Sequence, residues 1–357
     1  MTALSQMVQL NPYQAAARLS VEKIWQRLPP ADRPCACLIW AVLAPSPHNT
    51  QPWLWKVTTT DIELRADRSR LLQFNDPAGR KLVISCGCAL QNLTVALRAF
   101  QIDHRVIEFP DPTDPDLLAR VELSVKAASE DPHAVDLLTA IRHRRTNRAP
   151  FTELGAPPEV IDALGEDARE FGVRCAQVAD PSRAAVAELV STADREELDD
   201  ANFRTELAAW IRPRRTRRQD GMPADLLGAR GASAVLAGVA MRRLNLGHRE
   251  ASRDHALVDH SPDLLVIGSE SDDARAWLST GRALTRMTLR LAGAGLAHGY
   301  LGQACEVPRL RDQLATMVEL PNPQLIVRAG KSMFRPRASP RRPIADVLIS
   351  DLWTSPA

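Results

Sequence analysis

Two stretches of the chain, residues 87–97 (GCALQNLTVAL) and 281–291 (GRALTRMTLRL), share one pattern of apolar and polar positions at an offset of 194 residues. Five of the eleven aligned positions are identical, beginning with Gly87 and Gly281. In both stretches mainly apolar positions recur at the i, i+4, i+7 spacing that lines one face of a helix. Each stretch therefore predicts a helix, and the match indicates either an internal repeat or two core helices that share a start by chance.

Strand-like segments beside these helices favour the repeat. Residues 53–57 and 61–65 alternate in polarity as a hairpin does. Further strands are expected at residues 103–109, 263–268 and, beyond a turn at 299–303, 321–330. Residues 81–85 (KLVIS) could form another strand or open the first helix. Each half is therefore expected to be α+β, with helices packed on a sheet.

The length of 357 residues fits two domains or one large unit of two parts. A boundary is expected in one of two stretches rich in proline and acidic residues, 110–115 or 129–132. We divide the chain into a first half, residues 1–128, and a second half, residues 129–357. Residues 212–261 are rich in arginine, glycine and polar side chains and have no counterpart in the first half. We interpret this stretch as an insertion that serves as a lid or binding segment, or as surface decoration.

Charge and composition give no reason to expect nucleic acid or a membrane as partner. The formal charge is +2, from 45 Lys and Arg against 43 Asp and Glu. The first twenty residues do not have the pattern of a secretory signal, and later segments do not approach the roughly 18 uninterrupted apolar residues of a membrane span. We therefore expect a cytoplasmic protein.

The six cysteines do not form a recognised pattern for disulfides or for a metal. They include two C-x-C pairs, which differ from the C-x-x-C spacing of metal knuckles. We expect buried free thiols and no metal site. The positions are Cys35, Cys37, Cys86, Cys88, Cys175 and Cys305.

The first motif with chemical content is residues 44–53 (APSPHNTQPW), where an expected helix over 32–43 stops at a proline. Two further prolines stiffen a loop that presents Ser46, His48, Asn49 and Gln51. Several short polar groups at fixed positions suit a polyol chain and the polar edge of a flat heterocycle. The alternative is a rigid turn whose polar side chains cap the neighbouring helix and strand.

The second motif is residues 142–148 (RHRRTNR), at the end of a helix that is expected to start near Asp131 and Pro132. Arginines at a helix C-terminus complement its partial negative charge, which would explain one or two of them. Four arginines in seven positions, with Thr146 among them, indicate a phosphate ligand held by guanidinium groups. Residues 339–342 (SPRR) could add another phosphate contact or form an exposed basic tail.

Together these motifs resemble the nitroreductase superfamily of FMN-dependent oxidoreductases, and most of all its mycobacterial branch of fused proteins, the Acg group. Residues 44–53 are similar to the family's A-P-S-x-x-N-x-Q-P-W loop, and residues 144–151 (RRTNRAPF) to its N-terminal R-R-S-x-R-x-F motif. The helix after Gly281, the pair Gly302 and Gln303, and the pair Arg341 and Arg342 follow in the family's order. The resemblance covers roughly residues 36–347, apart from 212–261.

The order of the motifs departs from the family. There the arginine motif precedes the loop within one subunit, and each FMN lies between the two chains of a homodimer. Here the loop occurs only in the first half and the arginine motif only in the second. The resemblance thus implies a nitroreductase-like fold whose two halves form an intramolecular pseudo-dimer, monomeric because the dimer is built in, with one complete FMN site and one lost. That site would comprise Ser46, Asn49, Gln51 and Trp53 from the first half and Arg144, Thr146, Arg148, Gly302, Gln303, Arg341 and Arg342 from the second.

The reaction that the resemblance implies is hydride transfer from NAD(P)H to FMN and on to a nitroaromatic or quinone acceptor. Because the cofactor carries this chemistry, we name no catalytic residue and interpret His48 as a packed loop histidine. The main alternative is a non-enzymatic FMN-binding protein, for storage or sensing, in which the 212–261 insertion shuts out NAD(P)H. Nucleic-acid binding through residues 212–218 (RPRRTRR) is disfavoured, because that run lacks interleaved aromatic side chains.

Overall fold

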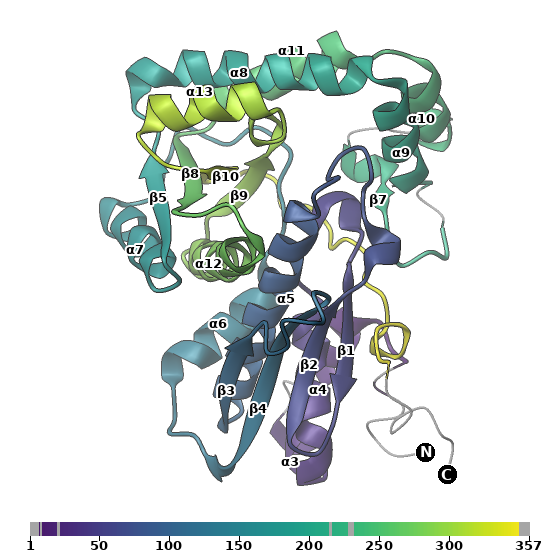
Figure 1. Cartoon of the computed structure of the whole chain (residues 1–357), viewed down its shortest axis with the longest axis vertical. Helices are drawn as coiled ribbons and strands as arrows, with labels where there is room; N and C mark the ends of the chain where they lie inside the picture. The colour runs from purple at the N-terminus through teal and green to yellow at the C-terminus, as the bar shows by residue number, and fades with distance from the viewer. Residues whose placement is uncertain (1–6, 8, 20–21, 214–215, 228–231, 350–357) are drawn as a thin grey trace.

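The computed structural model of the chain describes residues 7, 9–19, 22–213, 216–227 and 232–349. Two four-stranded sheets lie in its lower and upper parts as seen in Figure 1. The lower sheet has the order β1-β2-β4-β3, with β1 (Trp53–Val57), β2 (Asp61–Ala66), β3 (Ile102–Glu108) and β4 (Leu117–Ala127). The upper sheet has the order β5-β8-β10-β9, with β5 (Val173–Gln177), β8 (Asp263–Ser269), β9 (Ala297–Leu301) and β10 (Pro323–Gly330).

The two sheets have the same topology. In each, all neighbouring strands are antiparallel, and the first two strands are followed by one long helix and then by the last two strands. The long helices are α5 (Arg80–Ala99) and α12 (Ala274–Gly293), which contain the two matching stretches. The segment 81–85 opens α5, so the alternative of a separate strand there is wrong.

Helices α5 and α12 pack directly against each other between the two sheets (Figure 1). A Cβ atom on Gly281 would lie 1.9 Å from the carbonyl oxygen of Ile84, and one on Gly87 would lie 2.1 Å from that of Leu278. The glycine shared by both stretches is thus explained, because only glycine allows the two backbones to approach this closely. The largest cluster of buried apolar side chains draws on both halves around these helices.

The repeat continues past the helices at the same offset. Gln101 and Gly295 both adopt positive φ, 57° and 71°, where the chain turns from the helix into a strand. His104 on β3 and His298 on β9 are also 194 residues apart. The expected turn at 299–303 is wrong in part, because its first three residues belong to β9 and only the remainder turns.

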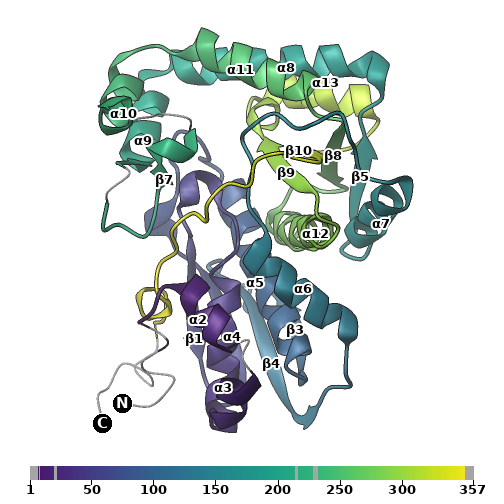
Figure 2. The ribbon, with the colours of Figure 1, turned by 180° about the vertical axis from the view of Figure 1, so that it is seen from behind.

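Further helices cover the sheets. In the first half α2 (Pro12–Leu19), α3 (Glu22–Arg27) and α4 (Arg33–Ala41) lie on the side of the lower sheet that Figure 2 shows. Between the halves, α6 (Pro132–His143) lies beside α5, with the Asp131 side chain capping its N-terminus as expected. In the second half α7 (Pro158–Arg169) packs on α12, and α13 (Pro308–Val318) lies over the upper sheet. The stretch 110–115 is the turn between β3 and β4, which leaves 129–132 as the link between the two sheets.

A long excursion separates β5 from β8, where the first half has only a three-residue turn between β1 and β2. It contains α8 (Asp180–Asp199), α9 (Ala201–Trp210), α10 (Ala232–Arg243) and α11 (Gly247–Asp259), and the short parallel pair β6 (Ile211–Arg212) and β7 (Met222–Pro223). Helices α8 and α11 run side by side across the top of Figure 1, and α9 and α10 extend beside the first half. The stretch 212–261 is therefore the later part of a mostly helical excursion. Within the basic run 212–218, residues 214 and 215 lie outside the described residues.

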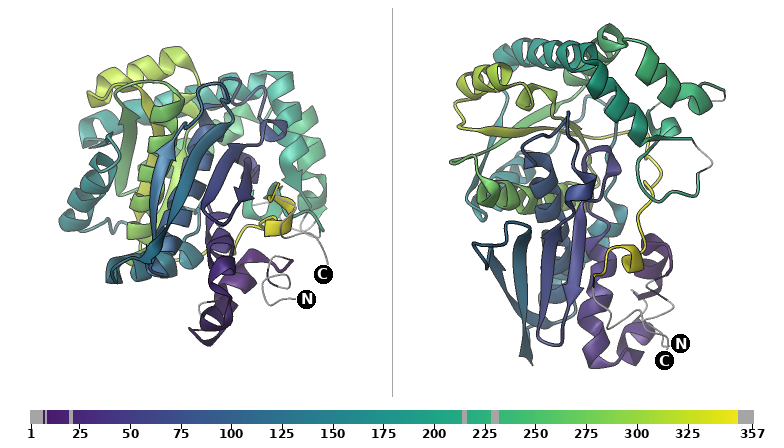
Figure 3. Two further views of the ribbon diagram at one scale, coloured as in Figure 1. Left: turned by 60° about the horizontal axis from the view of Figure 1, so that its bottom comes forward. Right: turned by 45° about the vertical axis from the view of Figure 1, so that its right-hand side comes forward.

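After β10 the chain returns to the first half as an extended segment, residues 331–349, called here the C-terminal strap (Figures 2 and 3). Near its end, the Trp55 amide donates to the Val347 carbonyl oxygen at 2.7 Å, and the Ile349 amide donates to the Trp55 carbonyl oxygen at 2.9 Å. The strap thereby adds a short parallel bridge to β1, at the edge of the lower sheet.

Two further expectations concern membranes and cysteines. Among the described residues, α5 has the length and composition of a bilayer-crossing helix, but 89% of that window is buried inside the protein, as in a core helix. All six cysteines are free; five are buried and Cys175 is half-buried. The described part of the chain contains no group of three or more His, Cys, Asp or Glu side chains placed to hold a metal ion.

Candidate functional site

The loop at residues 44–53 has an unusual backbone. His48, Asn49 and Gln51 adopt positive φ of 48°, 57° and 54°, a region that side chains other than glycine rarely occupy. Within the loop, the Ser46 hydroxyl accepts a hydrogen bond from the Gln51 amide at 2.9 Å. Trp53 follows as the fully buried first residue of β1. Three such residues in one short loop indicate a backbone shape that the surrounding structure enforces, as is common at binding sites.

The side chains of Asn49 and Gln51 bind two other segments of the protein. The Asn49 amide nitrogen donates to the carbonyl oxygens of Gly221 and Pro340, both at 3.0 Å, and its oxygen accepts from Nη1 of Arg341 at 3.0 Å. The Gln51 side chain donates to the Gln219 carbonyl oxygen at 2.8 Å and accepts from a backbone amide of the strap. The loop, residues 219–221 of the excursion and the strap therefore meet at these two buried side chains.

Arg341 and Arg342 attach the strap to the loop. Besides Asn49, Arg341 donates to the Leu43 carbonyl oxygen at 3.2 Å, and the Arg342 amide donates to Oε1 of Gln51 at 2.8 Å. The Arg342 guanidinium lies 3.7 Å from the carboxylate of Asp67. Burial lowers the pKa of both arginines from the ordinary value. Their guanidinium groups thus already hold protein acceptors, which the basic sequence pattern did not indicate.

The arginine motif follows α6 and is fixed to β9. Arg144 is buried, and its Nη1 lies 3.3 Å from Nε2 of His298. Thr146 forms a backbone bridge with His298, and the Asn147 amide donates to the His298 carbonyl oxygen at 2.8 Å. Burial raises the pKa of the neighbouring Tyr300 to about 12, although the Arg144 charge opposes this rise. The motif is therefore an ordered segment packed beside the last strands of the second half.

Arg148 differs from the other arginines of the site. Its half-buried guanidinium group forms no hydrogen bond or ion pair with any described residue. Burial lowers its pKa, and the positive charge of Arg253 lowers it further. The charges of Tyr300 and Asp254 act in the opposite direction, but neither forms an ion pair with Arg148. A guanidinium group that is partly removed from water and has no carboxylate within ion-pair distance can bind an anion.

The charge of Arg148, in the second half, acts on His48, in the loop of the first half. Its Nε2 atom is buried without a hydrogen-bond partner among the described residues. Burial, followed by the charges of Lys81 and Arg148, lowers the pKa of His48 to about 3, so the imidazole is neutral. The charge of Arg148, in the arginine motif, thus reaches the imidazole beside Asn49 in the loop.

Other elements contribute polar groups to this region. Gln303, at the start of the short helix η5 (Gln303–Cys305) that follows Gly302, donates to the Asp254 carboxylate at 2.6 Å, while its Oε1 atom is buried and unpaired. Asp194 has a buried unpaired Oδ2 atom. Burial raises the pKa of both Asp194 and Glu197 to about 8. Neither Oε1 of Gln303 nor Oδ2 of Asp194 has a hydrogen-bond partner among the described residues.

Sequence reasoning missed these carboxyl groups. Asp194 and Glu197 lie on α8 and Asp254 on α11, inside the excursion, and no motif spacing connects them with the loop. Buried polar atoms are nearly always paired in folded proteins, so a concentration of unpaired ones from both halves indicates a polar ligand. Charge interactions link the guanidinium group of Arg148 with His48 of the loop and with Asp254 of α11.

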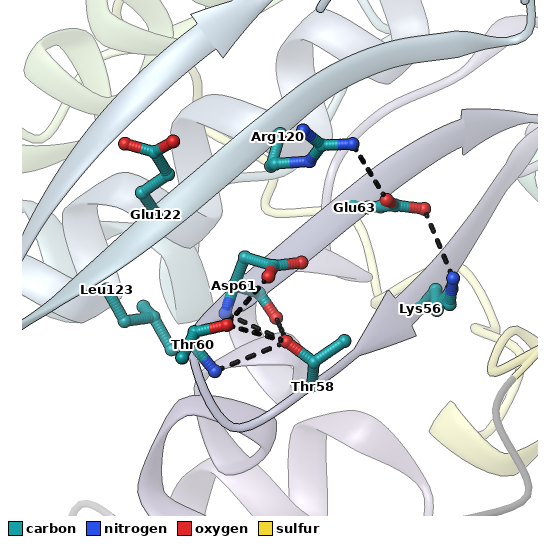
Figure 4. A pocket seen from close by; sticks show the side chains of 8 residues that line it. All are labelled: Lys56, Thr58, Thr60, Asp61, Glu63, Arg120, Glu122 and Leu123. Atoms are coloured by element: carbon teal, nitrogen blue, oxygen red, sulfur yellow. Dashed lines mark hydrogen bonds and ion pairs between the residues drawn. The ribbon is translucent and has the colours of Figure 1, made fainter.

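An open hollow lies elsewhere on the molecule. It measures about 550 Å³ and is open on the first sheet, where Figure 4 shows its lining. Lys56 and Arg120 both pair there with Glu63, at 3.9 and 3.3 Å, so the charges are already balanced. None of the eleven predicted site residues lines it. The lining residues are Lys56, Thr58, Thr60, Asp61, Glu63, Arg120, Glu122 and Leu123.

The chain matches no family model, but it has clear relatives. It is 32% identical over 328 residues to Rv3131 of Mycobacterium tuberculosis, a protein named as an NAD(P)H nitroreductase, covering 90% of this chain and 92% of the relative. It is 31% identical over 322 residues to acg of the same organism, which has the same name, covering 86% and 92%. The chain belongs to the nitroreductase family. These relatives confirm, over most of the length of this nitroreductase, the family that the two sequence motifs indicated.

Solved structures give a weaker likeness to this nitroreductase. The FMN-dependent nitroreductase NfnB from Mycobacterium smegmatis, in complex with NADPH, has 18% identity and a TM-score of 0.38, covering 58% of this chain and 95% of that one. A nitroreductase with bound FMN from Bacteroides fragilis has 14% identity and a TM-score of 0.33, covering 56% and 92%. Scores this low do not establish a shared overall fold, and the family assignment depends on the sequence relatives.

Proposed function

We propose that this nitroreductase binds one FMN between the loop at residues 44–53 and the arginine motif. The observation that carries the proposal is the guanidinium group of Arg148, which faces the His48 loop and has no acidic partner among the described residues. A phosphate monoester would supply the missing negative charge. The relatives named as NAD(P)H nitroreductases agree with a flavin ligand.

We further propose that the two halves form an intramolecular pseudo-dimer. The strand orders β1-β2-β4-β3 and β5-β8-β10-β9, the paired helices and the constant offset support an internal duplication. The loop comes from one half and the arginine motif from the other, so only one complete site is expected. A chain of this kind would be monomeric and cytoplasmic.

The predicted site residues divide into two roles. Arg144, Thr146 and Arg148 would hold the phosphate, while Gln303, with a buried unpaired oxygen, would bind the polar part of the cofactor. Asn49, Gln51, Arg341 and Arg342 would act by fixing the loop, because their polar groups already bind the strap and the excursion. Ser46 and Trp53 anchor the two ends of that loop, and Gly302 precedes Gln303. When bound, FMN would supply hydride transfer from NAD(P)H to a nitroaromatic or quinone acceptor.

One observation favours the second candidate, an FMN-binding protein that does not turn over. The excursion is attached to the first half at three places: Asn49 with Gly221, Arg70 with Asp220 at 3.1 Å, and Glu206 with the amides of Phe74 and Asn75. These contacts would place residues 206–213 and 219–221 as a cover beside the loop. A cover held this way would exclude NAD(P)H while leaving FMN bound.

Absorbance of the purified full-length protein tests both candidates. A yellow protein with one FMN per chain supports the binding site, and a colourless protein that takes up no FMN contradicts both candidates. Anaerobic addition of NADH or NADPH should bleach the flavin if the protein is an oxidoreductase. A flavin that dithionite bleaches but neither nucleotide does would support the covered, non-enzymatic protein instead.

A further inference from the structure

A second hollow, of about 330 Å³, lies between the two halves, away from the proposed FMN site. Helix α5, strand β3, the turn that follows α7 and helix α12 all contribute to its wall. The lining residues are Gln91, Thr94, Arg98, His104, Arg105, Val106, Glu170, Phe171 and Arg282. The proposed function uses none of these residues.

The internal repeat relates this hollow to the position of Arg144. Three residues near the Arg144 guanidinium are known from its interactions: His298, whose Nε2 is 3.3 Å away, and Cys88 and Tyr300, where its charge opposes the rise in pKa that burial causes. A fourth residue, Thr285, donates to the Cys88 carbonyl oxygen. At the offset of 194 residues their counterparts all line the hollow. These counterparts are His104, Arg282, Val106 and Gln91.

The first half has no arginine motif that could fill this related position. The space that the Arg144 side chain occupies in the second half is therefore open at the equivalent position of the first half. Arg282 lines it instead from α12, the long helix of the second half. A positive charge is therefore present in this hollow as well, although it comes from Arg282 and not from an arginine motif.

Two side chains that line this hollow each have a buried polar atom with no hydrogen-bond partner among the described residues. One is Nε of Arg282, a donor, although Nη1 of the same residue pairs with Glu108 at 2.6 Å and the group lies 4.8 Å from the centre of the Phe171 ring. The other is Oε1 of Gln91, an acceptor on a side chain that is only 4% exposed. A ligand that satisfies both must accept one hydrogen bond and donate another.

The remaining charges at the hollow favour an anion. Arg98 forms no hydrogen bond or ion pair with the described residues, and Arg105 pairs with the exposed Glu122 outside the hollow. His104 bonds through Nδ1 to the Ile102 carbonyl oxygen, which leaves Nε2 available. Glu170 contributes the negative charge of the lining, and it lies 3.7 Å from Arg286.

We propose that this hollow is a second ligand site, for a small oxyanion that also carries a hydroxyl hydrogen, such as a hydrogen phosphate group or a hydroxycarboxylate. The oxyanion accepts from Nε of Arg282 and from Arg98, and its hydroxyl donates to Oε1 of Gln91. The site is too small and lacks the loop and arginine motif needed for a second FMN. The proposal depends on the repeat and on the hollow, and it stands whether or not FMN binds at the first site.

Histidine-ring NMR of the full-length protein tests the proposal. The His104 signals are assigned with His104→Gln, and inorganic phosphate, lactate, sulfate and acetate are then titrated separately at neutral pH. Phosphate or lactate should shift the His104 signals in a saturable way and raise the His104 pKa, which burial and then the Arg98 and Arg282 charges now lower. The groups that face His104 are Asp103, Arg98, Arg282 and Glu170.

The comparison among anions and variants decides the outcome. Sulfate and acetate lack a hydroxyl hydrogen at neutral pH, so each should bind about tenfold more weakly than phosphate or lactate, respectively. Arg98→Gln and Gln91→Leu should weaken phosphate binding by a similar factor, while Arg249→Gln, on exposed α11, should not change it. Absence of a saturable shift with all four anions, or equal affinity in Arg98→Gln and the parent, would overturn the proposal. FMN content, measured on the same samples, reports separately on the first site.

Discussion

Gly87 on α5 and Gly281 on α12 lie against each other where the two long helices cross. A Cβ atom on Gly87 would be 3.1 Å from the Cα atom of Gly281 and closer still to the Leu278 carbonyl oxygen. Each glycine therefore meets the backbone of the other repeat, and the two halves share one close contact between equivalent positions. This contact fixes the position of one half relative to the other. The distance between the loop, in the first half, and the arginine motif, in the second, depends on that position.

Alanine at either glycine should destabilise the fold strongly. The new methyl group of Gly281→Ala would meet backbone at 1.9 Å, so the helices must separate and the shared core must repack. We expect a loss of about 3 kcal/mol or more in the free energy of unfolding, measured in urea. Gly293→Ala, on the same helix with no atom within 4 Å of the added Cβ, should be neutral or slightly stabilising. Equal stability of the two variants would contradict the close contact.

Arg148→Gln should separate binding from stability. Because the Arg148 guanidinium has no acidic partner among the described residues, its removal should leave the unfolding free energy of the apoprotein unchanged or slightly higher. FMN affinity should fall by about 30-fold or more, as expected for loss of one charged hydrogen-bonding group. Fluorescence titration of FMN measures the affinity, with Arg249→Gln as the control. A stable variant with parental affinity would remove Arg148 from the phosphate site.

Asp220→Asn should loosen the cover formed by the excursion. Asp220 is buried and pairs with Arg70 at 3.1 Å, Arg212 at 3.2 Å and Arg218 at 3.1 Å, so neutralising it leaves three guanidinium groups with weaker partners. If residues 219–221 keep NAD(P)H out, the rate of anaerobic flavin bleaching by NADPH should rise at least several-fold. Stopped-flow absorbance measures this rate. Glu188→Gln, which breaks the exposed ion pair with Arg195, is the control. An equal bleaching rate in Asp220→Asn and Glu188→Gln would mean that residues 219–221 do not block NADPH.

Stability should fall as pH rises toward 8. Burial raises the pKa of Asp194 from 3.8 to about 8, so the folded protein keeps this proton over a range in which the unfolded chain has released it. Stability from this group is present below about pH 4 and is lost progressively up to about pH 8, at no more than about 1.4 kcal/mol per pH unit. Glu197 acts in the same direction, because burial raises its pKa to about 8 as well. Asp194→Asn should flatten the decline in urea denaturation between pH 5 and 8, and an unchanged slope would contradict the assignment.

The apolar pattern predicted the helices and strands that carry the repeat. The hairpin β1–β2, the strand β8 and both long helices were expected from residues that alternate or recur at helical spacing. Strand β4 was not, because its residues follow a stretch of Pro and Asp that seemed to end a domain, although it forms a tight turn between antiparallel strands. Helix α11 was hidden by its polar composition, whereas α10 (ASAVLAGVAMRR) is mainly apolar and was missed because the whole stretch 212–261 was interpreted as an insertion.

The candidate site was predicted only in part. Sequence order indicated that the loop and Arg148 belong together, because both fall in recognisable motifs. It could not show that Asn49 binds Arg341 or that the excursion reaches the loop, since these contacts join residues 292 and 172 positions apart. Asp194 and Asp254 could not be found at all, because ordinary surface helices also contain such residues, and only tertiary packing makes these two unusual.

The bridge between Val347 and Trp55 has a consequence for how the site responds to dilution. When two separate subunits build a site, it comes apart once their concentration falls below the dissociation constant. Here the strap that reaches the lower sheet is the tail of the same polypeptide, so its local concentration is set by chain length alone. Ligand affinity should therefore be the same at nanomolar and micromolar protein, and the edge of β1 is covered without any second molecule.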